Sequence, residues 1–413
     1  MLTAMQSLDN PLAQLRRTHE AQVLGLLRRQ GALSRAELGS RSGLSRTTLY
    51  DIVSGLLASG TVVAAGPQGP RRRGRPVELI SLNPAAGYAL GIDFARRAVH
   101  VAMVNAAHEV IGTAGEEHPA GLGLDSRVAL ARRLVTALGA GTPQPGSLGA
   151  IGVGVVGPVP NAGTEPNGRL SQALYEAFAA PVVLDNNTRL AALAEATWGA
   201  AAGCADALYL RLSYGVGGGL VVGGALHRGA DGLSGEIGHI VVEPGGHRCE
   251  CGGRGCLETV SSVGAVLSAV RAAGGTADSL PGLVRAASAG DRAVLDVLGV
   301  VGERVGRVLA ALCNAIGPSA LVVGGELTET GSPLFGPMEA ALREGFAPFA
   351  RSRLELRRAV LGDYGGALGG IALVLHESPL LARYATPIQR SKTDDASDKK
   401  ADDLVDGGTR ERH

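Results

Sequence analysis

The chain of 413 residues has few aromatic residues, no lysine before Lys392 and no long apolar run. Aromatic side chains make up 3 % of it, whereas glycine occurs 62 times. This composition disfavours an aromatic-lined β-sandwich and favours α/β packing with many close backbone approaches. No run reaches the ~18 apolar residues of a membrane span, and no basic, apolar leader opens the chain. We therefore expect a multidomain, cytoplasmic α/β protein.

The net charge of +1 hides an uneven distribution of charge. Residues 1–83 contain eleven arginines and five acidic residues, a balance of +6, so the remainder of the chain carries −5. A basic end on a mildly acidic body is typical of a protein that contacts a phosphate backbone with one end only.

The first part of the chain has the pattern of three helices. Apolar residues recur at helical spacing over residues 11–30, and Gly31 ends this run. Ser34 and Ser45 then stand at the N-caps of two short helices that are separated by a tight turn. This order of helix, helix, turn and helix indicates a helix-turn-helix.

Two β-rich runs, 61–65 and 77–82, bracket a long basic tip and complete a winged helix-turn-helix, which we place at residues 11–82. The helix that begins at Ser45 is the expected major-groove reader, and the tip arginines suit a narrow, A·T-rich minor groove. The predicted DNA contacts are Ser34, Arg35, Ser45, Arg46, Thr47, Thr48, Tyr50, Arg71, Arg72, Arg73 and Arg75. The alternatives are a helical interaction module with no role on DNA and, for the arginine run, a solvated loop.

From Tyr88 onward, β-rich runs alternate with helical ones, and a second, similar half begins near Ala205. Two related halves predict a bilobed α/β domain with a cleft, placed at residues 86–384. Residues 388–413 contain too little apolar material to fold and are predicted to form a disordered tail.

Three cysteines, Cys249, Cys251 and Cys256, lie within eight residues of one another. The spacing is too tight for a secretory disulfide framework, and three thiolates with one imidazole make a closed, structural zinc site. His239 and His247 are the two candidates for the fourth ligand, and we favour His239 because His247 would double back beside its own loop. We predict one structural Zn²⁺ per chain; chance clustering of thiols is the alternative.

Residues 235–262, GEIGHIVVEPGGHRCECGGRGCLETVSS, resemble the signature of the ROK family of repressors and sugar kinases. The similarity covers about residues 10–380. It implies a bilobed fold of the actin and hexokinase class, with zinc bound by His239, Cys249, Cys251 and Cys256. The N-terminal reader resembles that of the repressor branch of the family.

Kinases of this family hold phosphates on a glycine-rich first hairpin and use an aspartate as the base, and phosphoryl transfer needs both parts. Here the hairpin, residues 91–97, lacks the phosphate-loop glycines, and Asn187 occupies the position of the base. A carboxamide cannot accept a proton at neutral pH but can hydrogen-bond a sugar hydroxyl. The glycines at 215–219 and 324–325 resemble nucleotide loops, although such glycines more often form tight turns. We expect neither catalysis nor ATP binding.

The resemblance implies sugar contacts from five residues, with the loop 152–158 as one wall. They are Asn186, Asn187, Glu236, His239 and Glu258. The alternative is that Glu236 and Glu258 only orient the zinc loop.

We therefore expect a sugar-responsive regulator, a repressor of carbohydrate genes that binds a palindromic operator as a homodimer or tetramer. A sugar or sugar phosphate is the expected effector. The rivals are a sugar kinase with an appended reader, and a regulator whose pocket is vestigial and whose signal is a protein partner.

Overall fold

The computed structural model describes residues 11–65, 78–105, 109–119, 121–139, 148–159, 168–346 and 354–377. The four arginines predicted for the wing tip, Arg71, Arg72, Arg73 and Arg75, and the predicted tail at 388–413 lie outside these ranges.

The N-terminal part folds as three helices and a three-stranded antiparallel sheet, the elements expected of a winged helix-turn-helix. Their bounds are α1 Pro11–Gln30, β1 Leu33–Ser34, α2 Arg35–Ser42, α3 Arg46–Ala58, β2 Val62–Ala65 and β3 Leu79–Leu82. The strand order is β1-β3-β2. Aliphatic side chains at helical spacing bury the inner faces of the three helices against β3, and Gly43 ends α2 in the left-handed conformation (φ 69°).

The first lobe of the larger part is built on a mixed five-stranded sheet of order β6-β5-β4-β7-β8. Its elements are η1 Pro84–Ala86, β4 Tyr88–Phe94, β5 Ala98–Asn105, β6 Val110–Glu117, α4 Leu124–Gly139, β7 Leu148–Val155, α5 Gly168–Phe178 and β8 Val182–Asn186. Strands β4, β7 and β8 run parallel, so their carboxyl ends lie at the same edge of the sheet, with β7 between β4 and β8.

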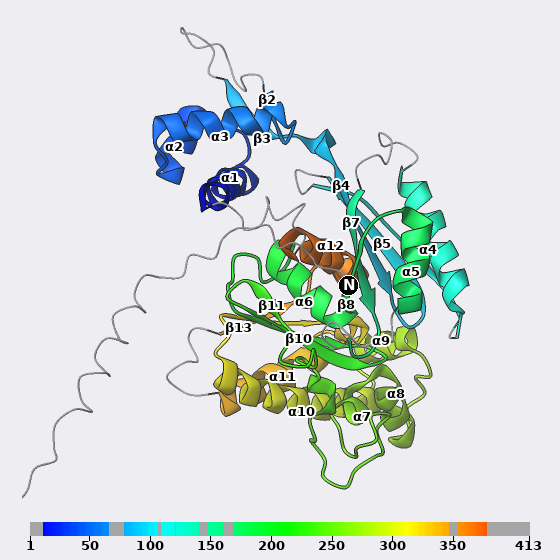
Figure 1. Cartoon of the computed structure of the whole chain (residues 1–413). Helices are drawn as coiled ribbons and strands as arrows, with labels where there is room; N and C mark the ends of the chain where they lie inside the picture. The colour runs from blue at the N-terminus through cyan, green and yellow to red at the C-terminus, as the bar shows by residue number, and fades with distance from the viewer. Residues whose placement is uncertain are drawn as a thin grey trace, which may run out of the picture.

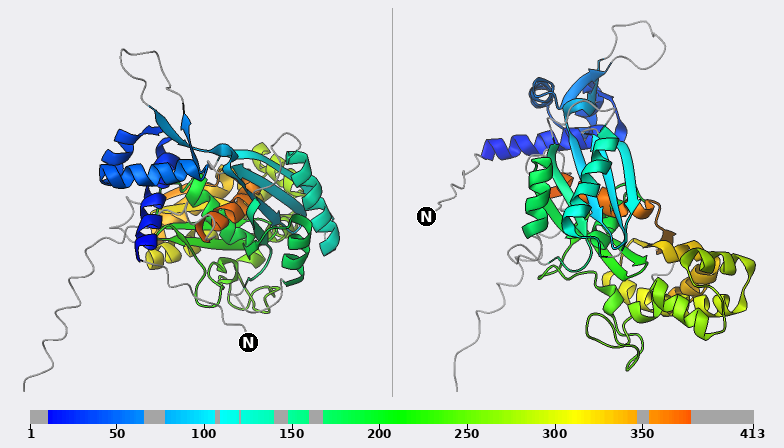
Figure 2. Two further views of the ribbon diagram at one scale, coloured as in Figure 1. Left: turned by 45° about the horizontal axis from the view of Figure 1, so that its top comes forward. Right: turned by 90° about the vertical axis from the view of Figure 1, so that its right-hand side faces the viewer.

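The second lobe holds a sheet of order β11-β10-β9-β12-β13 and a layer of helices. Its elements are α6 Asn187–Trp198, β9 Ala207–Leu212, β10 Val216–Val222, β11 Ala225–His227, η2 Ile237–His239, α7 Glu258–Ser261, α8 Val263–Ala272, α9 Leu280–Ala289, α10 Arg292–Ile316, β12 Ala320–Gly324, η3 Glu326–Thr330, α11 Ser332–Gly345, β13 Glu355–Arg358, η4 Gly362–Tyr364 and α12 Gly365–Glu377. In Figure 1 and the right-hand view of Figure 2, α8–α11 and the three-helix domain lie at opposite ends of the molecule.

Helices α6 and α12 pack against each other and lie between the two large sheets (Figure 1). Glycine makes this close layer possible. A Cβ on Gly91 of β4 would lie 1.8 Å from the carbonyl oxygen of Ala367, and one on Gly152 of β7 would lie 1.8 Å from that of Gly370. Glycine is therefore required at these two positions, because α12 packs directly on the backbone of the first sheet.

The glycines at 217–219 lie in strand β10 and not in a turn. A Cβ on Gly217 would meet the side chain of Thr188 at 3.3 Å, and one on Gly219 would meet that of Ala192 at 2.5 Å. These two glycines let β10 pack against α6, and this packing accounts for them without a nucleotide.

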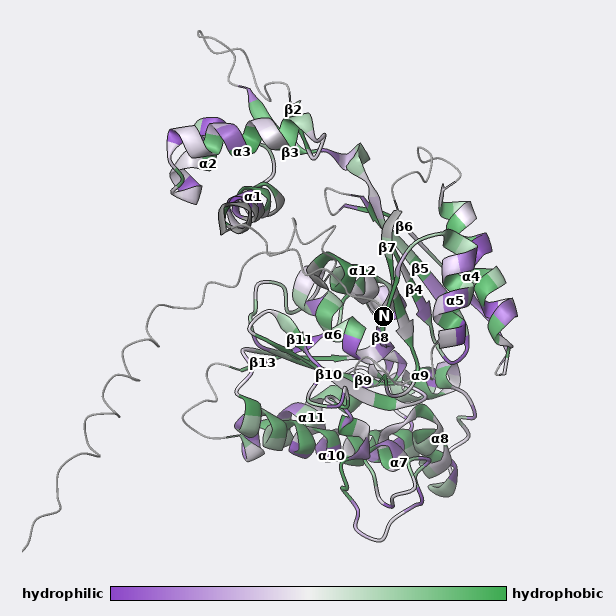
Figure 3. Ribbon diagram, viewed as in Figure 1, coloured by the Kyte–Doolittle hydropathy of each residue, from purple (hydrophilic) through white to green (hydrophobic). Residues whose placement is uncertain are grey.

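Hydrophilic and hydrophobic residues alternate around α2 and α3 (Figure 3), as expected of helices that are half buried. Among the helices that the structure describes, none combines the length and the apolar character needed to cross a membrane.

Candidate effector pocket and metal centre

A cavity of about 830 Å³ is lined by residues of both lobes. All five residues predicted to contact a sugar line it, namely Asn186, Asn187, Glu236, His239 and Glu258. Residues 156–158, at the end of the predicted 152–158 wall, line it as well. Residues 156–158 and Glu258, which are 100 positions or more apart in the sequence, thus line one cavity.

Asn186 joins two walls of the cavity. Its side-chain oxygen caps α6 by accepting from the backbone N–H groups of Thr188 (2.9 Å) and Arg189 (3.1 Å), and its amide nitrogen donates to the carbonyl of Gly157 (2.9 Å). Because both ends of the carboxamide already have partners, Asn186 shapes the wall at least as much as it offers a contact.

Asn187 faces a buried carboxylate. Its amide nitrogen donates to Oδ1 of Asp93 at 3.1 Å, and the two residues are 6 % and 0 % exposed. The other oxygen, Oδ2, has no hydrogen-bond partner within the described residues. Burial raises the pKa of Asp93, although the charge of Arg211 opposes the shift. The carboxamide at position 187 therefore avoids placing two carboxylates side by side.

The two glutamates have different partners. Oε2 of Glu258 accepts from the backbone N–H of Val216 at 2.8 Å, so this side chain fixes the start of β10. Oε2 of Glu236 lies 3.6 Å from Nε2 of His239. Glu236 thus lies beside the ring of the predicted metal-binding histidine, whereas Glu258 contacts the backbone of β10.

The cysteine loop assembles four donor atoms that could hold a metal ion. The nitrogen of His239 and the sulfurs of Cys249, Cys251 and Cys256 all lie within 4.8 Å of one another. Nδ1 of His239 is 3.6 Å from the sulfur of Cys249, and the sulfurs of Cys251 and Cys256 are 3.7 Å apart. In a tetrahedral zinc site, Zn–S bonds of about 2.3 Å and a Zn–N bond of about 2.0 Å place nitrogen and sulfur about 3.6 Å apart and two sulfurs about 3.8 Å apart. The donor set fits that ion, and it contains His239 and not His247.

The loop is shaped by its own backbone. The N–H of Cys249 donates to the carbonyl of Gly253 (2.9 Å), and the N–H of Gly255 donates to that of His247 (2.8 Å). Gly255 has φ 72°, and a Cβ there would lie 1.8 Å from the carbonyl oxygen of Glu243. Only glycine fits at that position. With Nδ1 of His239 toward the cysteines, its Nε2 is left toward Glu236 and the cavity.

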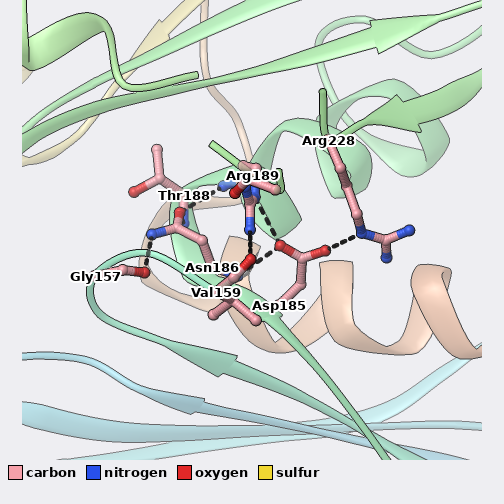
Figure 4. Close-up of polar contacts among 8 residues, drawn as sticks. Gly157, Val159, Asp185, Asn186, Thr188, Arg189 and Arg228 are labelled. Atoms are coloured by element: carbon pink, nitrogen blue, oxygen red, sulfur yellow. Dashed lines mark hydrogen bonds and ion pairs between the residues drawn. The ribbon is translucent and has the colours of Figure 1, made fainter. Parts of the chain in front are cut away.

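A buried ion-pair network, which sequence inspection did not find, supports the cavity (Figure 4). The carboxylate of Asp185, 1 % exposed, contacts Nε of Arg189 at 2.7 Å and Nε of Arg228 at 2.5 Å. The guanidinium of Arg189, also 1 % exposed, donates to the carbonyls of Gly232 and Val159. These bonds connect two loops to the start of α6: one carries pocket residues 156–158, and the other carries pocket residues Leu233, Gly235 and Glu236. The sequence does contain an acidic and a basic residue four positions apart, Asp185 and Arg189. This spacing is common on solvent-exposed helices, so it did not indicate that the pair is buried.

The residues predicted to contact DNA differ in accessibility. Ser45, Arg46, Thr47 and Tyr50 are exposed at the start of α3, and Thr48 and Arg35 are half-buried. Ser34 is 7 % exposed, and its hydroxyl is engaged in a capping box with Glu37. Ser34 therefore starts α2, and we leave it out of the proposed DNA surface.

The fold and the site define a class, a bilobed sugar-kinase-like domain that follows a helix-turn-helix reader. The sequence profile of the ROK family matches residues 89–377, and the chain belongs to this family.

Two regulators align with nearly the whole chain. The DNA-binding transcriptional dual regulator NagC of Escherichia coli K12 is 28 % identical over 384 residues, 87 % of this chain and 93 % of its own length. The crystal structure of a ROK family transcriptional regulator, a homologue of the E. coli Mlc protein, matches 91 % of this chain and 98 % of its own with a TM-score of 0.74 at 25 % identity.

An enzyme of the same family aligns with less of the chain. The ROK glucokinase of Streptomyces griseus, solved with glucose and AMPPNP, matches 70 % of this chain and 99 % of its own, with a TM-score of 0.61 at 25 % identity. The additional length of this chain is thus shared with the regulators.

Proposed function

We propose that the chain is a DNA-binding transcriptional regulator, a repressor of carbohydrate genes, which is controlled by a sugar or sugar phosphate bound in the cleft. The observation that carries this proposal is the pairing of a three-helix, winged domain with a cavity between the two lobes that Asn186, Asn187, Glu236, His239 and Glu258 line. We propose that Asn187 stands in this cavity where the family's kinases have the catalytic base. Full-length similarity to NagC and to the regulator related to Mlc supports it. The sugar is held by groups at Asn187, Glu236, His239 and Glu258, since each hydroxyl taken from water needs a partner.

The absence of catalysis follows from two features of the cleft. Asn187 cannot accept a proton, and its amide is already bonded to Asp93. The hairpin between β4 and β5 carries Ala95, Arg96 and Arg97, where the family's kinases have small residues beside phosphate. A sugar kinase, the first of the two rival functions, would need a proton-accepting base at position 187 and small residues in this hairpin.

The DNA surface of the proposed regulator is the exposed start of α3. Tyr50 is 61 % exposed, and the guanidinium of Arg35 lies 5.3 Å from its ring centroid and 3.5 Å from Glu78. Arg35 thereby joins the start of α2 to the base of the wing. With Arg46 and Thr47 beside them, these side chains form one face for the major groove, and the tip arginines at 71–75 are proposed for the adjacent minor groove, with A·T-rich flanks.

A homodimer, or a pair of dimers, is the proposed assembly. Two readers then match a palindromic operator whose half-site spacing is set by protein symmetry. The effector acts if it binds more tightly to one of two arrangements of the readers than to the other.

The direct test is a gel-shift titration of the zinc-loaded protein on DNA from its own upstream region, with and without a panel of sugars. A shift that one sugar moves supports the proposal. DNA binding that no sugar affects would favour a protein partner as the signal, and sugar-dependent ATP turnover would restore the kinase.

Arg46→Ala is expected to weaken operator binding by about tenfold and to lower the salt slope by about one, because an arginine at the start of α3 contacts DNA phosphate or a base edge. Fluorescence anisotropy across a salt series measures both quantities. Arg292→Ala is the matched control, since Arg292 is 91 % exposed at the far end of the molecule. Equal affinity and slope for the two variants would remove Arg46 from the DNA surface.

One structural Zn²⁺ per chain, held by His239, Cys249, Cys251 and Cys256, is part of the proposal. When bound, the ion supplies a rigid cross-link of the cysteine loop to the segment that carries Glu236. Cys251→Ser is expected to release the metal and to abolish the sugar response, whereas Cys204→Ser should keep both. Elemental analysis measures the metal, and a Cys251→Ser protein that keeps one zinc per chain would refute the ligand set.

A further inference from the structure

The hairpin that joins β4 to β5 reaches across the cleft to the second lobe. Its two arginines, Arg96 and Arg97, both line the effector cavity. Nη2 of Arg96 lies 3.7 Å from a carboxylate oxygen of Glu250 in the cysteine loop. The guanidinium of Arg97 lies 5.3 Å from the ring centroid of Tyr214, which is in the turn between β9 and β10. Two cations of the first lobe therefore face polar and aromatic groups of the second.

Arg96 lies next to the wall that carries a proposed sugar-binding group. A Cβ built on Gly215 would lie 3.2 Å from Oε2 of Glu258 and 4.0 Å from Nη2 of Arg96. The side chains of Glu258 and Arg96 therefore both lie next to Gly215. A sugar held by Glu258 would have the guanidinium of Arg96 within reach of its substituents.

Among the described carboxylates that line the cavity, only that of Glu250 lies within 4.0 Å of either arginine. Glu258 accepts from Val216, Glu236 faces His239, and Glu326 pairs with Arg211 at 3.4 Å. The side chains of Arg96 and Glu250 are 51 % and 81 % exposed, so their ion pair contributes little free energy in water. In the part of the chain that the structure describes, no carboxylate lies within 4.0 Å of Arg97.

From this arrangement we propose that Arg96 and Arg97 form a subsite for an anionic group, and that the effector is a sugar that carries one, as a phosphate or a carboxylate. Planar guanidinium groups donate pairs of N–H bonds that match either anion. A cavity of about 830 Å³ has room for a sugar and such a substituent. This inference rests on the proposed function, since it names the class of its effector.

The test compares matched pairs of ligands on the full-length, zinc-loaded protein. Isothermal titration with glucose, galactose, mannose and N-acetylglucosamine, each beside its 6-phosphate, and with glucuronate and galacturonate shows whether the charged form binds more tightly. We expect one anionic sugar to bind at least about tenfold more tightly than its neutral parent, since hydrogen bonds to charged groups are roughly twice as strong as neutral ones. Inorganic phosphate and AMPPNP are included as probes of phosphate without the sugar.

The variants separate the subsite from a general effect of charge. Arg97→Gln and Arg96→Gln should each weaken the anionic sugar by about 10- to 100-fold and leave the neutral parent within about twofold. Arg271→Gln, an exposed arginine on α8 outside the cavity, should change neither. Melting temperature and zinc content confirm that each variant is folded.

Three results would overturn the inference in different ways. A neutral sugar that binds as tightly as its anionic forms would reject the subsite and leave the proposed regulator intact. AMPPNP that binds more tightly than every sugar phosphate, with the same loss in Arg97→Gln, would assign the arginines to a nucleotide. If protein that still binds its operator binds no sugar of either kind, both the subsite and the sugar-effector part of the proposed function fail.

Discussion

Asp185→Ala is expected to lower the free energy of unfolding by about 3–5 kcal/mol, because it leaves the buried guanidinium of Arg189 without its counter-ion. Arg189 is 1 % exposed and would keep only the carbonyls of Gly232 and Val159 as acceptors. The loops that these carbonyls belong to continue into the cavity wall, so the variant should also lose the effect of the sugar on DNA binding. Urea denaturation and the gel shift with effector measure the two losses.

The chain offers a matched control for this experiment. Asp296 and Arg292 also form an ion pair at a spacing of four residues, but their side chains are 69 % and 91 % exposed. Asp296→Ala should therefore change the free energy of unfolding by less than about 0.5 kcal/mol. The double variant Asp185→Leu with Arg189→Met should be more stable than Asp185→Ala, because the buried charge of Arg189 is removed together with that of Asp185, and only Arg228, whose side chain is 27 % exposed, loses its contact with this carboxylate. Equal stability of Asp185→Ala and Asp296→Ala would show that water reaches the network.

The sequence predicted the parts of the site whose signals are local. The spacing of Cys249, Cys251 and Cys256 predicted a metal-binding loop, and the structure brings their sulfurs together with His239. Ser45 was placed correctly at the start of the third helix because its hydroxyl caps Thr48, a contact within three residues. Short-range chemistry of this kind needs no knowledge of the fold.

The parts that were missed depend on burial and on contacts across the cleft. Arg96 was not predicted to line the pocket, because its contact with Glu250 joins residues that are 154 positions apart in the sequence. Ser34 was predicted both as an N-cap and as a DNA contact; the structure confirms the cap, and the burial of the side chain, which the sequence did not show, speaks against the contact. The glycines of β10 resembled a nucleotide-binding loop in the sequence. Their packing against α6 could be recognised only once the fold had placed that helix.

Asn187, which we propose takes the position of the base in related kinases, lets the cleft hold a buried carboxylate beside it. Asp93 is fully buried with its pKa raised by that burial, and Asn187 donates to it across 3.1 Å. In Asn187→Asp, two carboxyl groups would face each other at this distance, where both cannot ionise at low cost. One of them must hold a proton, so the folded variant would have a carboxyl pKa well above that of the unfolded chain.

Asn187→Asp is therefore expected to lose stability as the pH rises. Below about pH 4 both states of the variant are protonated at this site, and its deficit should be no larger than that of Asn187→Ala. Above this pH the unfolded chain ionises first, and the deficit should grow by up to about 1.4 kcal/mol per pH unit until the raised pKa is reached. Urea denaturation of both variants and the parent protein at several pH values from 5 to 8 measures this slope.

Asn187→Ala is the matched control, because it removes the hydrogen bond to Asp93 without adding a charge. That hydrogen bond lowers the pKa of Asp93, so the deficit of Asn187→Ala should also grow with pH, but less than that of Asn187→Asp. A deficit of Asn187→Asp that rises no more steeply than that of Asn187→Ala would mean that water or a rearrangement separates the two carboxyl groups. We also expect no sugar-dependent ATP turnover from Asn187→Asp, because Arg96 and Arg97 still occupy the first hairpin. Turnover in this variant would show that the base alone had been lost, and that the hairpin still admits a nucleotide.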